Sequence, residues 1–166
     1  CGGTWSFGNV DNDFNLIKTD ENGVEQWDQT FGGINEDEGR AVQQTTDGGF
    51  IICGLTWSFG NGSSDVYLIK TDSNGIQQWD QTFGGINEDE GWFVQQTTDG
   101  GFLYRCDAWY YGNGVNDVYL LKTDKNGVEH WDQTFGGINE DEGRSVQQTT
   151  DGGFIIGGLT WVTGSG

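Results

Sequence analysis

The chain has 166 residues, with 26 acidic side chains against 7 basic ones and a net charge of −19. This negative field repels nucleic-acid phosphates and anionic lipid, so we expect neither nucleic-acid binding nor membrane insertion. The 8 Trp, 10 Phe and 5 Tyr residues argue against a disordered acidic chain. The composition is typical of a folded acidic protein, and we expect it outside the cell or at the cell surface.

A repeat of 52 residues organises the chain. Lys18, Lys70 and Lys122 follow one another at this spacing, and no insertion or deletion interrupts the phase. The segment WDQTFGGINEDEG occurs three times without a change, and the start of the chain, 1–10, repeats at 157–166. We therefore expect a single repeat array over 1–166. Its units run approximately over 13–64, 65–116 and 117–166, with 1–12 as a partial unit.

Each unit contains four strand signals in chain order. In 65–116, DVYLIKTD ends at the turn DSNG, and IQQWDQTF ends at the loop GGINEDEG. WFVQQTT then leads into the hairpin signal DGG, and FLYRCDAWYY follows. No helical periodicity occurs. The first and fourth strands are apolar and the middle two more polar, which predicts a sheet graded from a buried strand to a wet rim.

This pattern predicts an all-β fold of four-stranded antiparallel propeller-type blades in three repeats. The alternative is a flat β-solenoid with one wet face. The stretch IKTDENGVEQWDQTFGG at 17–33 resembles the tryptophan-docking stretch of quinoprotein-type propellers. TTDGGFIICG at 45–54 resembles the repeats of secreted bacterial and archaeal β-propellers. The resemblance implies that Trp27, Trp79 and Trp131 are buried between blades.

Three blades are too few for a ring, because propellers close with four to eight. The sequence leaves three alternatives open: a segment of a longer array, a ring completed by several chains, or an open fibre. A strand present at both ends of the array suits addition to a neighbouring chain by β-augmentation. We therefore expect self-association into a homo-oligomer or a fibre.

The acidic loop is the first candidate site. Three adjacent carboxylates repel one another unless they are solvated or neutralised, and calcium prefers carboxylate and amide oxygens. A solvated acidic rim is the alternative. The candidate calcium ligands are Asn35, Glu36, Asp37, Glu38, Asn87, Glu88, Asp89, Glu90, Asn139, Glu140, Asp141 and Glu142. The pairs Asp20/Asn22, Asp72/Asn74 and Asp124/Asn126 are interpreted as turn residues instead.

The middle unit is the second candidate site, because it departs where the other two agree. Aromatic and charged residues gather there, and Tyr, Trp and Arg commonly anchor interfaces and sugar sites. Drift in one repeat is the alternative. The candidate residues for a carbohydrate or a peptide are Trp92, Tyr104, Arg105, Asp107, Trp109, Tyr110 and Tyr111.

Three cysteines are disulfide candidates. Cys1 and Cys53 are one repeat apart, whereas Cys106 is displaced by one residue from the equivalent position. Because a shift of one residue turns a strand side chain to the other face, Cys106 is expected in a different environment from Cys53. An odd number of cysteines indicates an intermolecular disulfide or a free thiol.

Catalysis finds little support in the sequence. The single histidine, His130, occupies a position held by Gln26 and Gln78 in the sister units, so we expect an exposed rim position. The sequence therefore predicts a non-catalytic extracellular scaffold or fibre protein that self-associates and binds calcium. The alternatives are a sugar- or peptide-binding module and a fragment of a quinoprotein-type enzyme.

Overall fold

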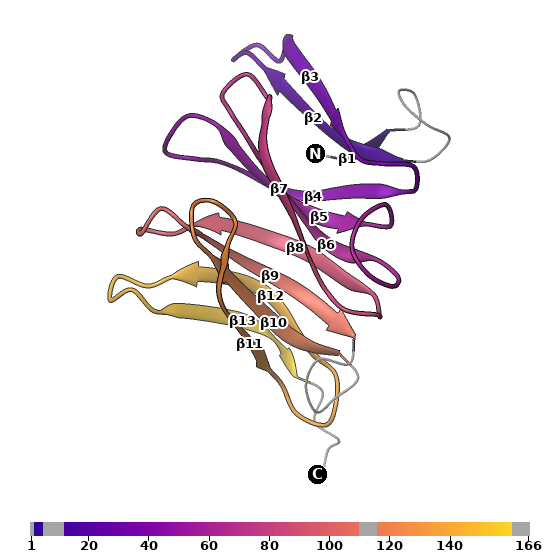
Figure 1. Ribbon diagram of the computed structural model, residues 1–166. Coiled ribbons are helices and arrows are strands. Elements are labelled where there is room, and N and C mark those ends of the chain that lie inside the picture. The colour runs from indigo at the N-terminus through magenta and orange to yellow at the C-terminus, as the bar shows by residue number, and fades with distance from the viewer. Residues whose placement is uncertain (1, 5–11, 110–115, 161–166) are drawn as a thin grey trace.

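The protein is entirely β in the computed structural model, which describes residues 2–4, 12–109 and 116–160 (Figure 1). None of these residues forms a helix, so none forms a helix long enough to cross a membrane. The strands are β1 Gly2–Thr4, β2 Asp13–Thr19, β3 Glu25–Phe31, β4 Asp37–Gln44, β5 Phe50–Thr56, β6 Asp65–Thr71, β7 Gln77–Phe83, β8 Asp89–Gln96, β9 Phe102–Trp109, β10 Asn116–Thr123, β11 Glu129–Phe135, β12 Asp141–Gln148 and β13 Phe154–Thr160.

These strands form four antiparallel sheets, here named I to IV. Sheet I has the order β1-β2-β3, sheet II β4-β5-β6-β7, sheet III β8-β9-β10-β11 and sheet IV β12-β13. The predicted four-stranded antiparallel blades are therefore present in sheets II and III. The sheets pack in a row from the N-terminal to the C-terminal end, with sheets I and IV at opposite ends, so the row is not a closed ring (Figure 1).

The predicted order of strands within a blade is wrong. The apolar strands β5 and β6 are neighbours at the centre of sheet II, and the more polar β4 and β7 form its edges. The expected unit 65–116 holds β6 to β9, which belong to two sheets. The reason is that the GGINEDEG loop crosses from one sheet to the next, whereas the DGG and DSNG turns join strands within a sheet.

The core lies between consecutive sheets. One buried cluster forms between sheets I and II around Phe14 and Ile69, and a second between II and III around Cys53 and Tyr104. A third, between III and IV, contains Val118 and Val146. Because every sheet presents side chains on both faces, the apolar central strands are covered twice only where a sheet has two neighbours.

The turns and bulges follow the repeat. Asp20 Oδ1 accepts hydrogen bonds from the N–H groups of Asn22 (2.8 Å) and Val24 (2.9 Å), which confirms the interpretation as turn chemistry. Gly48 adopts a φ of 84° in the β4–β5 turn. Register shifts occur near the start of β4, β8 and β12, and the bulged residues there are Arg40, Trp92 and Arg144.

Candidate interaction site at the two ends of the sheet row

Glutamine side chains join sheet II to sheet III and sheet III to sheet IV. Between sheets II and III, the Gln96 N–H donates to Gln43 Oε1 (2.6 Å), and the Thr46 N–H donates to Gln96 Oε1 (2.8 Å). The same two bonds recur between sheets III and IV, from the Gln148 N–H to Gln95 Oε1 (3.2 Å) and from the Thr98 N–H to Gln148 Oε1 (2.9 Å). A junction therefore needs the glutamine pairs of two adjacent sheets.

A tryptophan of each sheet docks on the next sheet. The indole of Trp27, in sheet I, packs edge-on against Phe50 of sheet II with ring centroids 5.7 Å apart. Its other neighbour is the β6–β7 turn, where a Cβ built on Gly75 would lie 2.8 Å from Trp27 Cζ3. Trp79 sits in the same way between Phe102 and Gly127 of sheet III, and Trp131 packs against Phe154 of sheet IV. The predicted docking between blades is thus confirmed, although these indoles are half-buried and not buried.

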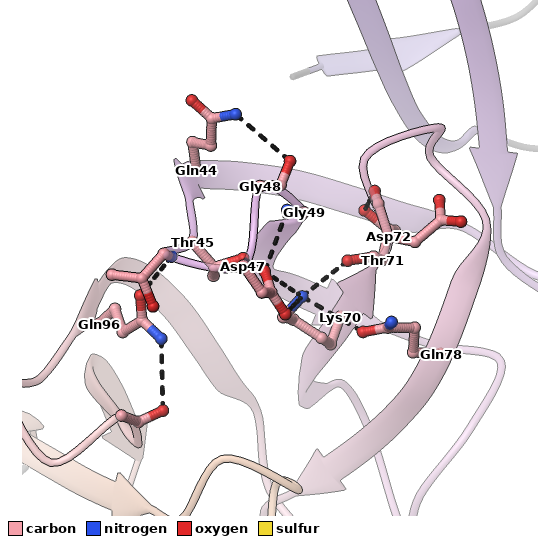
Figure 2. A network of polar contacts seen from close by, with 12 residues as sticks. Gln44, Thr45, Asp47, Gly48, Gly49, Lys70, Thr71, Asp72, Gln78 and Gln96 are labelled. Atoms are coloured by element: carbon pink, nitrogen blue, oxygen red, sulfur yellow. Dashed lines mark hydrogen bonds and ion pairs between the residues drawn. The ribbon is translucent and has the colours of Figure 1, made fainter.

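Each complete sheet holds an ion pair between a buried lysine and an exposed aspartate of a turn (Figure 2). Lys70 Nζ, on β6, lies 3.0 Å from Asp47 Oδ2 in the β4–β5 turn, and it also donates to the Thr71 carbonyl (2.7 Å) and Gln78 Oε1 (3.3 Å). In sheet III, Lys122 pairs with Asp99 at the same distance of 3.0 Å. The hydrogen bond from the Thr45 hydroxyl, helped by Lys70, lowers the pKa of Asp47 to about 2.

The third copy of the lysine, Lys18, and the third copy of the aspartate, Asp151, lie in different end sheets, at opposite ends of the row. Lys18 in sheet I donates to Gln26 Oε1 (2.6 Å) and forms no ion pair within 4 Å among the described residues, although its charge acts on Asp20 at longer range. Asp151 in sheet IV is exposed and accepts from the Thr149 hydroxyl and the Gly153 N–H. Gly23, the counterpart of Gly75, has no atom within 4 Å of a Cβ built on it.

Apolar side chains are exposed at the same two ends. Val42 is 42% exposed, whereas its counterparts Val94 and Val146 are both 5% exposed. Ile155 of β13 is 61% exposed, against 0% for Ile51 of β5. At each end of the row a core residue of the repeat therefore lacks the cover that its inner counterparts have. These residues are Val42, in sheet II beside sheet I, and Ile155, in sheet IV.

Hollows accompany these exposed residues. Between sheets I and II a hollow of about 260 Å³ is lined by Leu16, Ile17, Lys18, Thr19, Trp27, Val42, Gln44 and Phe50. Between sheets III and IV another of about 360 Å³ is lined by Val118, Phe135, Gly136, Asp141, Glu142, Gly143, Ile156, Gly158, Leu159 and Thr160. Each hollow adjoins an end sheet that has fewer than four strands.

The structure separates the carboxylates of the acidic loop. Glu36 is exposed and accepts a hydrogen bond from Asn12 Nδ2 (3.0 Å), while Glu38 lies 3.2 Å from Arg40. Asp37 is fully buried and accepts from the Gly33 N–H (2.7 Å). Asn35 binds the Trp57 carbonyl, and Asp89 accepts from the Gly85 N–H (2.8 Å) as Asp37 does from Gly33. In the other loops Glu88 and Glu140 are exposed, and Asn87, Glu90, Asn139, Asp141 and Glu142 are half-buried.

Each loop aspartate instead approaches an aspartate of another strand. A Cβ on Gly84 would lie 2.1 Å from Asp65 Oδ1 and 2.7 Å from Asp89 Oδ2, so both carboxylates face this glycine. Burial, with a contribution from the charge of Asp65, raises the pKa of Asp89 to about 6. Among the described residues no group of three or more His, Cys, Asp or Glu side chains could hold a metal ion. Calcium binding stays a prediction. The arrangement of Asp65 with Asp89 recurs in the other repeats, with Asp13 and Asp37 at Gly32 and with Asp117 and Asp141 at Gly136.

The middle unit does not present one exposed aromatic edge. Tyr104 and Arg105 are buried, and Arg105 donates to the Gly143 carbonyl across the junction between sheets III and IV. Trp92 is exposed at its bulge, with the Arg40 guanidinium 3.7 Å from its ring centroid. Arg40 also pairs with Glu90 at 2.8 Å. Tyr110 and Tyr111 lie outside the described residues, and of Asp107 and Trp109 only the backbone is described.

The two cysteines that the structure describes, Cys53 and Cys106, are interior. Cys53 and Cys106 are fully buried thiols of the cluster between sheets II and III, and burial raises the pKa of the Cys53 thiol to about 12. Arg105 occupies the repeat position of Cys53 and reaches the opposite junction, so the displacement by one residue does turn Cys106 to the other face of its strand. That face packs toward sheet II, so Cys106 lies in the same buried cluster as Cys53, and the prediction of a different environment is wrong. Cys106 therefore cannot form the intermolecular disulfide predicted for it without unfolding of this junction. Cys1 lies outside the described residues.

His130 is exposed, as the sequence predicts for its position.

The sequence analysis did not predict that the repeated lysine of one strand pairs with the repeated aspartate of a turn, as Lys70 does with Asp47 and Lys122 with Asp99. The sequence contains the pattern that indicates this pairing, because in two repeats a lysine follows the aspartate of a TTDGG turn by 23 residues.

Comparison with known proteins finds neither a protein family nor a curated protein sequence that matches this chain. The resemblance to secreted propeller repeats stays a prediction.

Proposed function

We propose that this chain is a non-catalytic structural module whose copies associate through the two ends of the sheet row, outside the cell or at the cell surface. One observation carries the proposal. The repeat places the same apolar side chains at inner and outer positions of the row. Val42, in sheet II beside sheet I, and Ile155, in sheet IV, are exposed where their counterparts Val94 and Ile51 are buried. Exposed apolar surface at an open sheet edge favours association, because burying it releases about 25 cal/mol per Å².

The charge of the chain is consistent with this role. With a net charge of −19, copies repel one another at long range, so only a contact that matches closely in shape and charge overcomes the repulsion. An acidic surface of this kind keeps an array with open edges soluble. A carbohydrate- or peptide-binding role has weaker support, because Tyr104 and Arg105 are interior and Trp92 is stacked against Arg40.

The mass of the purified chain in solution tests the proposal. Sedimentation or light scattering between about 1 and 100 µM, the range in which moderate protein affinities appear, is expected to show a species larger than the 18.2 kDa chain. Dithiothreitol is expected to leave that species intact, because Cys53 and Cys106 are buried. A stable monomer of 18.2 kDa over this whole range would contradict self-association.

A further inference from the structure

We propose that β13 of one copy takes the place of β1 beside β2 of a second copy. Strands β12 and β13 then join the β2 and β3 strands of the partner to form a complete four-stranded sheet, here called the composite sheet. The inference rests on the proposed self-association, and it names the contact surface and the partner. The partner is a second copy of this chain, because four features of the two ends match each other.

The first feature is register. In sheet II, β5 pairs with β6 over seven residues that end at Thr56 opposite Asp65. In sheet I, β1 pairs with β2 over three residues that end at Thr4 opposite Asp13, the same register one repeat earlier. Thr160, the last residue of β13, is the counterpart of Thr4 and Thr56. Strand β13 can therefore occupy over seven residues the register that β1 occupies over three.

The second feature is charge. The inner sheets each hold a buried lysine against an aspartate 23 residues earlier, as in Lys70 with Asp47. In the composite sheet the partner's Lys18 faces Asp151, the two members that lack this pairing within one chain. A like pair there would be strongly unfavourable, because the Lys70 side chain is only 4% exposed in the equivalent place.

The third feature is the tryptophan socket. Trp27 and Trp79 each lie between a phenylalanine and a turn glycine of the following sheet. Trp131 has the phenylalanine, Phe154, in sheet IV. The composite sheet supplies the glycine as the partner's Gly23, which is exposed and has a φ of +78° like its counterpart Gly75 at +79°.

The fourth feature is apolar cover. Ile51 of β5 packs in the same cluster as Val94 of the next sheet. The equivalent contact in the assembly is Ile155 with the partner's Val42, two residues that are 61% and 42% exposed in one chain. Val42 lines the hollow of about 260 Å³ between sheets I and II, so the incoming strand fills that hollow.

Counting sheets favours a closed pair of copies. Each copy contributes sheets II and III and one composite sheet, so a ring of two copies has six blades. Propellers typically have four to eight blades, and one copy or three copies would give three or nine. A head-to-tail contact forms a ring when the rotation closes and a fibre when it does not. We therefore infer a ring of two copies.

Charge exchange between Lys18 and Asp151 tests the composite sheet. The variants Lys18→Asp and Asp151→Lys are purified separately, and their masses are measured alone and after mixing in equal amounts. Alone, each variant places like charges at both junctions, and its self-association is expected to weaken about 100-fold or more. Mixed, one junction regains the wild-type pair and the other a reversed pair, so a heterodimer of twice 18.2 kDa is expected.

Recovery of association on mixing requires that both variants are folded, so it excludes misfolding as the cause of their weaker self-association. Lys125→Asp is the matched control, because Lys125 is exposed in the β10–β11 turn. That control should associate like the wild type. If the wild type associates and the charge variants associate equally well, the composite sheet is wrong while the proposed function stands. If the wild type stays monomeric, both fail. Long polymers that respond to the charge exchange would overturn the ring of two copies.

Discussion

The indole of Trp79 lies against the backbone of Gly127 in the next sheet, and a Cβ on Gly127 would stand 2.9 Å from Trp79 Cζ3. Gly127 also has a φ of +80°, which side chains rarely adopt. Two constraints therefore meet at one turn. Gly23 shares the backbone conformation, with a φ of +78°, but has open space around it within one chain.

Replacing Gly127 by alanine is expected to lower the free energy of unfolding by about 2–4 kcal/mol, because backbone strain and a clash with the indole add together. Gly23→Ala is the matched control, and its expected cost is about 1 kcal/mol from the backbone alone. Urea unfolding of both variants, at a concentration where the chain is monomeric, measures the difference. Equal losses would contradict a stabilising contact between Trp79 and Gly127.

The sequence predicted the fold well because turn chemistry is local. The DGG and DSNG signals mark hairpins, and the strands between them are β-prone in every repeat. The order of strands in a sheet was not predictable in the same way, since a period of 52 residues has no marked starting point. The grouping of strands into sheets depends on whether Phe83, at the end of β7, and Asp89, at the start of β8, lie in the same sheet or in two sheets. The path of the loop between them is set by packing in three dimensions and not by local turn residues.

The candidate site was predicted less well. The duplicated end strand indicated self-association, but the pairing of Lys18 with Asp151 depends on which turn lies beside which strand. The acidic loop misled in one respect, because neighbouring carboxylates at the start of a strand lie in different environments. Asp37, the first residue of β4, is buried, whereas Glu36, just before the strand, is exposed. The burial of Arg105 could not be predicted from the sequence, because a shift of one residue in strand register moves a side chain from one face of β9 to the other.

The raised pKa of Asp89 predicts a pH dependence of stability. Its pKa is about 6 in the folded protein, against 3.8 for an ordinary aspartate, so the folded state binds more protons between these values. The free energy of unfolding is therefore expected to fall as the pH rises from about 4 to 6, by about 2 kcal/mol from this group. Urea unfolding at a series of pH values measures it.

Asp89→Asn should remove this decrease, because an amide still accepts the Gly85 hydrogen bond but does not titrate. Asp151→Asn is a control, since the Asp151 carboxylate is exposed and its pKa is lowered by the Thr149 hydroxyl. An unchanged pH profile in Asp89→Asn would assign the dependence to another group.

Calcium is expected to stabilise the protein at neutral pH. Two buried carboxylates that face the same glycine, Asp65 and Asp89, repel each other when both are ionised, and a divalent cation offsets that repulsion. Millimolar calcium should raise the thermal midpoint by a few degrees, since about 1 kcal/mol corresponds to about 2–4 °C in a domain of this size. EDTA should reverse the rise, and Asp89→Asn should reduce it, because the equivalent pairs Asp13/Asp37 and Asp117/Asp141 remain. A midpoint that is indifferent to calcium and EDTA would leave the loops as solvated turns.

Asn15 stands where Tyr67 and Tyr119 stand in the inner sheets. The Tyr67 ring packs on Phe14 of the preceding sheet at 5.4 Å, so a tyrosine at 15 would project toward the partner's Val118 in the composite sheet. Asn15→Tyr is expected to strengthen self-association about tenfold, because the ring fills part of the hollow of about 360 Å³ beside Val118. Asn74→Tyr, in the exposed β6–β7 turn of sheet II and outside the composite sheet, is the control and should leave the dissociation constant unchanged.

Removing residues 1–8 should also promote self-association. These residues include β1, which pairs with β2 over three residues in the register that β13 takes in the composite sheet. The shortened chain no longer has to release β1 before it accepts the longer strand, so it should associate faster and at lower concentration than the full chain. The mass measured over time after a jump to higher concentration gives the association rate. The mass at equilibrium over a series of concentrations gives the concentration at which association occurs. The same deletion combined with Asp151→Lys should stay monomeric, because the charge pair is lost whether or not β1 is present. Weaker association of the shortened chain would mean that β1 is part of the contact, and replacement of β1 by β13 would then be wrong.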